Sequence, residues 1–477
     1  MTRLLVLLPI IFWLTMPERE SAYGAVDTGM FLSGFALIVL MYWGLVRVLL
    51  GRRDGGWGAT GSARRGMSIA RGLSVAWFVF GLYQLGFPAA IERLGLPGTA
   101  LPAIVATLPA YACWAALHAT RFPVERQMWE QSLADRLANG APVHKPPTLW
   151  GYVSGQMRVG VLFAMVPVGG VLLLRDAAVW LLERSGIDTA TPTAETAISF
   201  GGIAVIFLGA PVLLRRVLPT SSMAEGPLRD RLEHVARKTG LKFRDILIWH
   251  TDNAVANAAV MGLFPQVRYV LLSDLLIETM TDRQIEAVFA HEVGHVRHRH
   301  MVWYVVFVAV LMLILAGPGT DAERWLRSVW VDGGDAIAFA IVGVTIASFL
   351  FLLGLLSRQF EQQADVFAAR NVTREPDAPE VMGAMVFSTA LRRVAQINGM
   401  PMTVPPLRAT PTGTVAWLLG HAGSFMHGTI RQRMDAVQEI ASDSGRARRF
   451  DQRMFFVRAL LLVLLAAGGF WLWMAPS

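Results

Sequence analysis

The strongest constraint on how this chain folds is a series of apolar stretches that are long enough to cross a lipid bilayer. A transmembrane helix needs about 20 predominantly apolar residues. Stretches near or above that length recur at approximately 29–50, 68–88, 99–118, 157–175, 197–214, 302–318, 336–356 and 455–474. Only 16% of the residues are charged, whereas soluble domains carry about 25%. The sequence therefore predicts a polytopic α-helical membrane protein with about eight spans.

The basic residues gather in alternate connections between these stretches. The Arg-rich set consists of the loops after the first and third stretches and the long segments 215–300 and 357–453. The other set is short and acidic or neutral, as in "GTDAERWLRSVWVDGGD". Because Lys and Arg concentrate on the cytoplasmic side of membrane proteins, the first set is expected to be cytoplasmic. The formal net charge of +8 follows from this topology. It argues against a nucleic-acid partner and favours an integral protein of a bacterial inner membrane.

The two long Arg-rich segments also have the composition of a soluble domain. In the first of them, "MAEGPLRDRLEHVARKTG" has helical periodicity with a Gly stop, and "FRDILIWH" and "VRYVLLSD" have the pattern of short strands. We therefore expect a small cytoplasmic α+β domain assembled from two insertions between spans. The expected regions are 1–214 with about five spans, 215–453 with this domain and two spans (about 302–318 and 336–356), and 454–477 with a C-terminal span.

The segment "HEVGHVRHRH" places four histidines and one glutamate within ten residues. It follows Thr281 and Gln284, whose spacing is the signature of a capping box at a helix start. On that helix His291 and His295 lie one turn apart on the same face, so their imidazoles can share one tetrahedral zinc ion. Glu292 would lie beside a bound water. The H-E-x-x-H pattern therefore predicts a zinc site with two histidine ligands and Glu292 as general base.

The other two histidines of this segment, His298 and His300, are expected not to bind the metal. His298 is seven residues from His291, a rise of about 10.5 Å along a straight helix, which is too far for both to reach one ion. The extended pattern H-E-x-x-H-x-x-G-x-x-H also fails, because His298 occupies its glycine position and Met301 its third histidine position. His300 is predicted to point away from the ligand face. Both are expected to be partly solvated residues at the membrane surface.

A third ligand must come from elsewhere, and "SRQFEQQADVFAAR" after the seventh apolar stretch supplies a candidate. Glu361 and Asp365 are four residues apart and share a helix face. The Glu361 carboxylate would complete a His-His-Glu site, and Asp365 would hydrogen-bond a ligand imidazole and fix its tautomer. An E-x-x-x-D pair by itself is more often a solvated helix face than a ligand set, so that alternative stays open at this point.

Three ordered stretches together resemble a known family. They are "NAAVMGLFPQVRYVLLSDLLIETMTDRQIEAVFAHEVGHVRHRH", "SRQFEQQADVFAAR" and "HGTIRQRM". The chain is similar here to the zinc metallopeptidase family of the type I CAAX prenyl proteases and the HtpX-like heat-shock membrane proteases. The resemblance covers about 220–440, and the first 200 or so residues show no motif of the family. It implies that Glu361 is the third zinc ligand and that Asp365 is its supporting partner.

The same resemblance assigns roles to four more residues. Asn257 and Ala258 would lie on an edge strand that pairs with substrate backbone, which agrees with the ability of an edge strand to bind an extended peptide. His427 would donate a hydrogen bond to the oxyanion, and Arg433 would support His427. The family usually has His-Pro where this chain has His427 followed by Gly428, so the local turn departs from the family pattern. An ordinary loop histidine is the alternative interpretation of His427.

Together these residues predict a zinc endopeptidase with one Zn²⁺ per chain. Zinc would lower the pKa of a bound water toward about 7. Glu292 would take the proton and pass it to the leaving amine, and His427 would stabilise the oxyanion. The expected partners are the lipid bilayer and protein or peptide substrates that are membrane proteins, misfolded proteins or lipid-modified peptides.

Two alternatives come from other functional classes. A site-2-type intramembrane protease also uses H-E-x-x-H, but its third ligand is an aspartate inside a span, typically before Gly. The only such pair of interest after the zinc helix is Asp332–Gly333, in the acidic loop that the charge pattern places across the membrane from His291. A non-catalytic zinc-binding membrane scaffold or transporter is the second alternative. It is disfavoured because all the proposed catalytic positions are filled.

Overall fold

The computed structural model describes residues 4–15, 25–51, 57–138, 148–189, 191–251, 255–314, 334–372, 380–398, 400–403 and 427–474. The chain divides into two compact units, Met1–Pro219 and Thr220–Ser477. The predicted boundary at residue 214 lies close to this division. The division of the chain into three functional regions stays a prediction.

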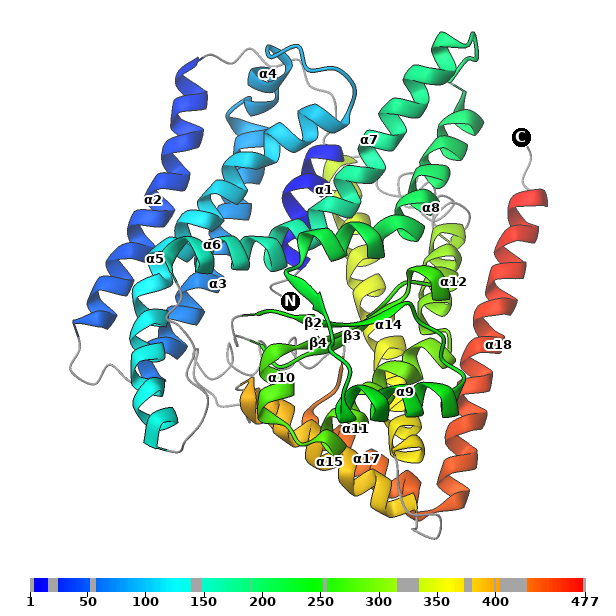
Figure 1. Cartoon of the computed structure of the whole chain (residues 1–477). Coiled ribbons are helices and arrows are strands. Elements are labelled where there is room, and N and C mark those ends of the chain that lie inside the picture. Colours follow the sequence, from blue (N-terminus) through cyan, green and yellow to red (C-terminus); the bar gives the residue numbers. More distant parts are fainter. Residues whose placement is uncertain are drawn as a thin grey trace. The chain divides into compact units, whose positions relative to one another are not determined.

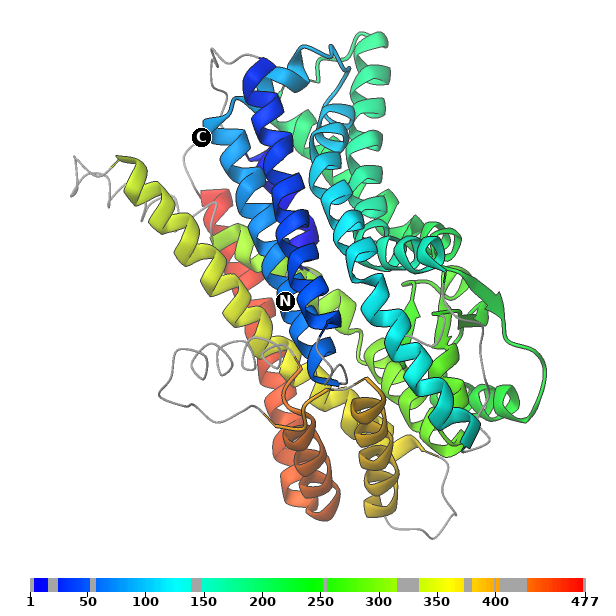
Figure 2. The ribbon, with the colours of Figure 1, turned by 90° about the vertical axis from the view of Figure 1, so that its left-hand side faces the viewer.

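The first unit is helical throughout its described residues (Figure 1). Its elements are η1 (Leu4–Leu7), α1 (Leu8–Leu14), α2 (Ala25–Leu50), α3 (Trp57–Gln84), α4 (Phe87–Glu92), α5 (Ala100–Ala138), α6 (Leu149–Met157), the π-helical turn η2 (Arg158–Leu162), α7 (Phe163–Arg184) and α8 (Pro192–Val217). The long helices α2, α3 and α5 pack side by side (Figure 2). Large buried side chains join them, including Phe31, Phe78 and Trp114.

The second unit combines a small sheet with helices (Figure 1). Its elements are β1 (Thr220–Ser222), α9 (Pro227–Thr239), β2 (Asp245–Trp249), β3 (Ala258–Met261), η3 (Pro265–Val267), β4 (Tyr269–Ser273), α10 (Asp274–Thr279), α11 (Asp282–Arg297), α12 (His300–Ile314), α14 (Gly334–Asn371), α15 (Glu380–Ile397), α17 (Ile430–Ser442) and α18 (Ser444–Met474). The strands predicted from "FRDILIWH" and "VRYVLLSD" are confirmed as β2 and β4. The predicted helix that stops at a glycine is confirmed as α9, which ends at the left-handed Gly240.

The sheet places β3 at one edge. The strand order is β1-β2-β4-β3. The central pair β2 and β4 is parallel, and each outer strand is antiparallel to its neighbour. Every residue of β4 is buried, as expected for a central strand covered on both faces. The open side of β3 is therefore the one through which another extended chain can join this end of the sheet.

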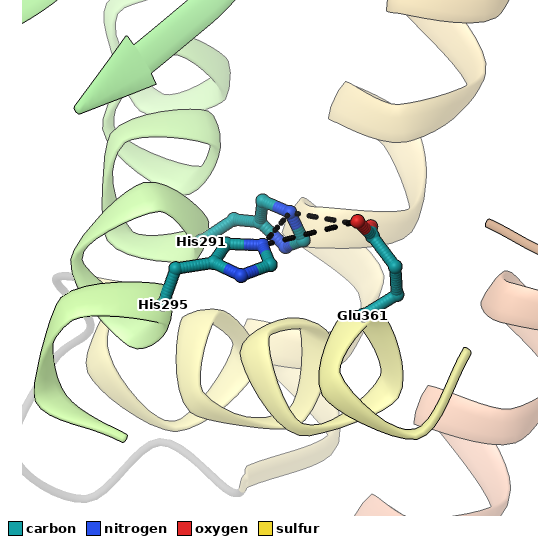
Figure 3. Close-up of side chains that lie close together, drawn as sticks. All are labelled: His291, His295 and Glu361. Atoms are coloured by element: carbon teal, nitrogen blue, oxygen red, sulfur yellow. Dashed lines mark hydrogen bonds and ion pairs between the residues drawn. The ribbon is translucent and has the colours of Figure 1, made fainter. Parts of the chain in front are cut away.

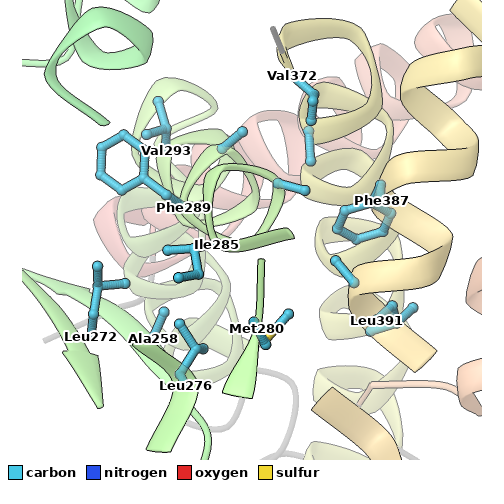
Figure 4. Close-up of a cluster of buried hydrophobic side chains, with 14 of the residues drawn as sticks. Ala258, Leu272, Leu276, Met280, Ile285, Phe289, Val293, Val372, Phe387 and Leu391 are labelled. Carbon is cyan, nitrogen blue, oxygen red and sulfur yellow. The ribbon is translucent and has the colours of Figure 1, made fainter. Parts of the chain in front are cut away.

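Helix α11 lies at the centre of the core of the second unit (Figure 4). Its buried side chains, which include Phe289 and Val293, meet Leu272 of the sheet on one side and Phe387 of α15 on the other. Burying an apolar side chain of this size contributes about 1.5–3 kcal/mol relative to leaving it exposed. Packing on several sides therefore fixes the position and rotation of α11, and with it the side chains of the H-E-x-x-H segment.

The described helices include membrane-spanning candidates in both units. Five are long and apolar enough to cross a bilayer: Asp27–Leu50, Gly61–Gln84, Ala100–Gln131, Leu149–Arg184 and Gly445–Trp471. A sixth results if α11 and α12, which meet at a bend of 45°, are counted as one broken span. The predicted spans at about 197–214 and 336–356 coincide with α8 and α14, whose side chains are only partly among the described residues. The total of eight spans stays a prediction.

Candidate metal centre

Two histidines of α11 point their ring nitrogens at the same spot. The predicted capping box starts this helix: Thr281 accepts from the N–H of Gln284, and the Gln284 side chain accepts from the N–H of Thr281. One turn apart near the other end, His291 and His295 bring their Nε2 atoms within 3.2 Å of each other. Helical spacing alone produces this approach, as the sequence predicts.

A carboxylate from a distant part of the chain completes the group. Glu361 lies on α14, and Figure 3 shows both imidazoles extending from α11 toward it. One Glu361 oxygen is 3.6 Å from Nε2 of His291, and the other is 4.0 Å from Nε2 of His295. The two helices approach closely because Gly294 has no side chain. A Cβ there would lie 3.0 Å from the Cα of Ala364.

These three side chains fit a zinc ion. Their ligand atoms all lie within 4.8 Å of one another. Ligand atoms at about 2.0–2.2 Å from a tetrahedral zinc are separated by roughly 3.3–3.6 Å. The two imidazole nitrogens, 3.2 Å apart, already lie close to this range, whereas the Glu361 carboxylate, whose two oxygens lie 3.6 and 4.0 Å from them, would have to approach further to enclose the ion. Two imidazole nitrogens and one carboxylate also form a donor set that zinc commonly takes when a fourth position stays open.

Asp365 and Arg433 lie directly behind the ligand atoms. Asp365 is fully buried, and its carboxylate is 2.9 Å from Nδ1 of His291, on the side of the ring away from the candidate metal position. Arg433, on α17, donates from Nε and Nη2 to the two oxygens of Asp365 at 2.9 and 2.6 Å, and its Nη2 is 3.2 Å from Glu361. Arg433 thus contacts the carboxylates, whereas the sequence predicted that it would support His427.

Hydrogen bonds and the charge of Arg433 lower the pKa of both carboxyl groups and keep them ionised. Burial acts to raise the pKa of Glu361, but the hydrogen bond to His427 and the Arg433 charge outweigh it, and the pKa lies well below its usual range. Burial likewise acts to raise the pKa of Asp365, and Arg433 and His291 reverse the effect. An ionised Asp365 accepts the Nδ1 proton of His291, and this tautomer leaves the lone pair of Nε2 free for a metal.

Glu292 occupies a different environment from the other two carboxyl groups. Burial raises the pKa of Glu292 to about 7, and Glu361 adds to the rise while His291 and Arg433 oppose it. The backbone N–H of Val260, in β3, is hydrogen-bonded to the Glu292 carboxylate. Glu292 therefore lies between the candidate metal position and the edge strand, with a pKa suited to taking and giving protons near neutral pH.

The register of β3 decides which of its backbone groups face the open edge. The N–H of Ser273 donates to the C=O of Asn257 at 2.9 Å. In an antiparallel ladder, hydrogen-bonded and non-hydrogen-bonded pairs alternate. Ala258 and Val260 belong to the second kind, so their N–H and C=O groups point away from β4. The bond between the N–H of Val260 and Glu292 agrees with this register.

His427 lies at the rim of the group. Its Nδ1 is 2.9 Å from Glu361, and 61% of its side chain is exposed. The following Gly428 adopts a left-handed φ of 73°, a conformation that proline cannot adopt because its ring fixes φ near −65°. The turn at His427 therefore differs from the one a His-Pro pair would make. His427 nevertheless contacts Glu361, one of the three candidate ligands.

A family match covers the part of the chain that carries this geometry. Residues 222–441 match the model of peptidase family M48. This stretch is an M48 peptidase domain. The CAAX prenyl protease 1 homolog of Oryza sativa is 30% identical over 175 residues, which are 34% of this chain and 40% of that protein. The HtpX protease homolog of Bacteroides fragilis is 27% identical over 174 residues, 34% of this chain and 51% of that protein. The predicted family is thus confirmed.

The chain spans about half or less of the length of these two relatives. Among solved structures, the crystal structure of S. mikatae Ste24p is similar, with a TM-score of 0.47 and 17% identity. That likeness covers 88% of this chain and 100% of the Ste24p chain.

Inside the M48 domain, the prediction that His300 is partly solvated and points away from the ligand face is wrong. His300 is 1% exposed, and its Nδ1 is 2.8 Å from Nδ1 of His295. On a straight helix two residues five positions apart would point about 140° away from each other. Arg299 breaks the helix with a left-handed φ of 55°, and the bend of 45° that follows turns His300 back toward the site. His298, the C-cap of α11, is partly buried as expected.

The M48 domain also uses a residue that no sequence pattern indicates. Asn398, just after α15, accepts from the N–H of Ala256 at 3.0 Å and donates to its C=O at 2.8 Å. Both backbone groups of one residue are thereby held immediately before β3. The two residues are 142 positions apart, and neither neighbourhood carries a motif for this contact. The competing Asp332–Gly333 ligand pair lies outside the described residues.

Proposed function

We propose that this chain is a membrane-integral zinc endopeptidase that hydrolyses peptide bonds near the cytoplasmic membrane surface. The observation that carries the proposal is the convergence of His291, His295 and Glu361, with Glu292 beside them at the end of an edge strand. One zinc ion per chain would be held by these three ligands. The M48 domain supports the peptidase class.

Each residue around the ligands has a separate task in this proposal. Zinc, when bound, supplies a Lewis acid that polarises a peptide carbonyl and lets water lose its proton near neutral pH. Asp365 fixes the tautomer of His291, and Arg433 holds Asp365 and Glu361 in place. Glu292 accepts the proton of the water at its carboxylate and then delivers it to the leaving amine nitrogen. His427 donates to the developing oxyanion from its exposed ring.

The open edge of β3 gives the substrate a place to bind. An extended peptide can pair there with the outward N–H and C=O of Ala258 and the outward C=O of Val260. Backbone pairing of this kind depends little on the side chains of the substrate. Ala258 would thus pair with the substrate backbone, and Asn257, whose N–H and C=O are both bonded to Ser273, would hold the start of the strand in place. The N–H of Val260 remains engaged by Glu292.

The surroundings of the site suggest the source of the substrate. Membrane-spanning helices in the same unit would keep the site close to the bilayer, and the positive-inside pattern supports a cytoplasmic site in a bacterial inner membrane. Relatives are named as CAAX prenyl protease and HtpX protease homologs. The substrates we propose are therefore membrane-associated proteins, either misfolded or lipid-modified.

Metal analysis combined with a peptidase assay tests this function. The full chain, purified in detergent, is expected to contain about one zinc per chain and to cleave an unstructured reporter protein. Removal of zinc with a chelator is expected to abolish cleavage, and stoichiometric zinc to restore it. A protein that binds zinc but cleaves no reporter under any condition would support the non-catalytic scaffold instead.

A proline scan of β3 tests how the substrate binds. Ala258→Pro removes an N–H that points to the open edge, so it is expected to lower kcat/KM by roughly five- to tenfold, the worth of one hydrogen bond. Ala259→Pro is the matched control, because it removes an N–H directed toward β4 and should instead lower the thermal stability. Equal kcat/KM for wild type and Ala258→Pro would exclude pairing at this edge.

A further inference from the structure

A series of polar contacts connects His295, the second candidate zinc ligand, with helix α18. Nδ1 of His295 is 2.8 Å from Nδ1 of His300. Nε2 of His300 is 3.0 Å from Oε1 of Gln363, and Nη2 of Arg458 donates to the same oxygen at 2.8 Å. The four residues lie on α11, α12, α14 and α18, so four separate segments of the chain contribute one member each.

The donors and acceptors in this series of contacts allow one arrangement of protons, and that arrangement leaves His295 able to bind metal. A guanidinium can only donate, so the amide of Gln363 must present its oxygen to Arg458. An amide oxygen can only accept, so Nε2 of His300 carries a proton. Nδ1 of a neutral His300 is then an acceptor, and Nδ1 of His295 must donate to it. The lone pair of His295 is thereby left on Nε2, the atom that faces Glu361.

Packing against aromatic rings holds the side chains of His300 and Arg458 in place. The ring of His300 stacks on Phe360 with centroids 4.3 Å apart and an interplanar angle of 4°. The guanidinium of Arg458 lies over the ring of Trp303, and Arg458 also donates to the C=O of His298. Little rotation is open to either side chain, so the proton arrangement is built into the packing.

The position of Arg458 is itself unusual. It lies within Gly445–Trp471, a helix that is apolar enough to cross a membrane. Phe455 and Phe456, just before it on the same helix, are each 68% exposed, as lipid-facing side chains would be. A charged residue in such a segment is costly, and where one occurs it usually serves function. Its polar partners here are Gln363 and the backbone of the zinc helix.

We propose that Arg458, Gln363 and His300 are positioning residues that fix the tautomer and ring orientation of His295 for zinc binding. This inference rests on the proposed zinc site. It gives the two ligand imidazoles different supports: His291 has the carboxylate of Asp365, whereas His295 has the neutral ring of His300, which Gln363 links to Arg458 on α18. The C-terminal helix would thereby determine zinc affinity in addition to anchoring the chain.

Zinc affinity, measured by competition with a chromogenic chelator, tests the proposal on the full chain in detergent. Loss of a group that supports a metal ligand typically weakens metal binding by 10- to 100-fold. His300→Phe keeps the stack on Phe360 but removes both nitrogens, so a loss of roughly this size is expected. His300→Asn retains an acceptor near the position of Nδ1 and is expected to recover part of the affinity. Cobalt substitution adds a visible spectrum that should change in His300→Phe if the orientation of His295 changes.

Two further pairs of variants distinguish a role in positioning His295 from a role in packing alone. Gln363→Leu removes the acceptor and is expected to weaken zinc binding, whereas Gln363→Glu keeps an acceptor for both neighbours and should stay within about threefold of wild type. Arg458→Leu is expected to weaken binding. Arg453→Leu is its matched control, because Arg453 makes the same kind of contact from the same helix to Gln362, at 2.8 Å, without touching a histidine.

The outcomes distinguish this inference from the proposed function. Thermal unfolding of the metal-free proteins first establishes which variants are folded, and the Gln363 and Arg458 pairs carry the test if His300→Phe is not. Normal zinc binding by wild type with equal affinity in Gln363→Leu and Arg458→Leu would overturn the inference alone. Equal losses in Gln363→Leu and Gln363→Glu would overturn it as well. A wild-type protein that binds no zinc would instead overturn the proposed function.

Discussion

Glu292→Gln is expected to retain its zinc and to lose peptidase activity by about 10²- to 10⁴-fold, the usual contribution of a general acid–base group. The glutamine has nearly the same shape, and its oxygen can still accept from the N–H of Val260. It cannot take a proton from water at neutral pH. Because Glu292 is not among the three converging ligand atoms, zinc content should not change. The measurement is kcat/KM on a reporter peptide together with the metal content of the same sample.

Glu286→Gln is the matched control for this variant. Glu286 lies on the same helix and is fully buried, but it pairs with Arg231 at 3.4 Å, away from the metal position. Its replacement is expected to lower stability while the activity of the folded, zinc-loaded protein stays close to wild type. Activity of Glu292→Gln within about threefold of the Glu286→Gln control would show that another group performs the proton transfer, and the mechanism proposed for Glu292 would fail.

The parts of the site that depend on local chain geometry could be predicted from the sequence. The capping box fixes where α11 starts, and a helical rise fixes the relation of His291 to His295. The same argument relates Glu361 to Asp365 on α14. Periodicity and turn residues likewise sufficed for the strands β2 and β4. Each of these features depends on residues only a few positions apart, so the local sequence pattern is sufficient to predict it.

The parts that depend on chain reversals and tertiary contacts could not be predicted. His300 was expected to point away, because nothing in "HVRHRH" indicates that Arg299 adopts a left-handed conformation. Arg433 was assigned to His427 through a family pattern, but its planar donors fit the carboxylate of Asp365, and packing of α17 against α14 decides that contact. The two hydrogen bonds between Asn398 and the backbone of Ala256 are likewise not indicated by any local sequence pattern. Such contacts arise where two helices meet, and spacing along one segment does not encode them.

Arg433→Met is expected to destabilise the second unit by about 3–5 kcal/mol, the usual cost of removing one partner from a buried ion pair. Arg433 is 14% exposed and pairs with Asp365, which is fully buried, as well as with Glu361. Methionine fills much of the volume but leaves both carboxylates without their counter-charge. Bound zinc would compensate Glu361 but would not contact Asp365. Thermal unfolding at a fixed scan rate should therefore show a midpoint lowered by about 6–20 °C even in the zinc-loaded protein.

Two further variants decide whether the lost charge is the cause. Arg431→Met lies two positions earlier on α17, where Arg431 is 71% exposed and pairs with Asp435, so it is expected to cost less than about 1 kcal/mol. Combining Arg433→Met with Asp365→Asn removes the uncompensated charge and should recover part of the lost stability, giving a coupling energy between the two sites. If Arg433→Met lowers the midpoint no more than Arg431→Met, the guanidinium does not hold the two carboxylates in the folded protein. The support that it is proposed to give the zinc ligands would then have to come from His291 and the bound metal alone.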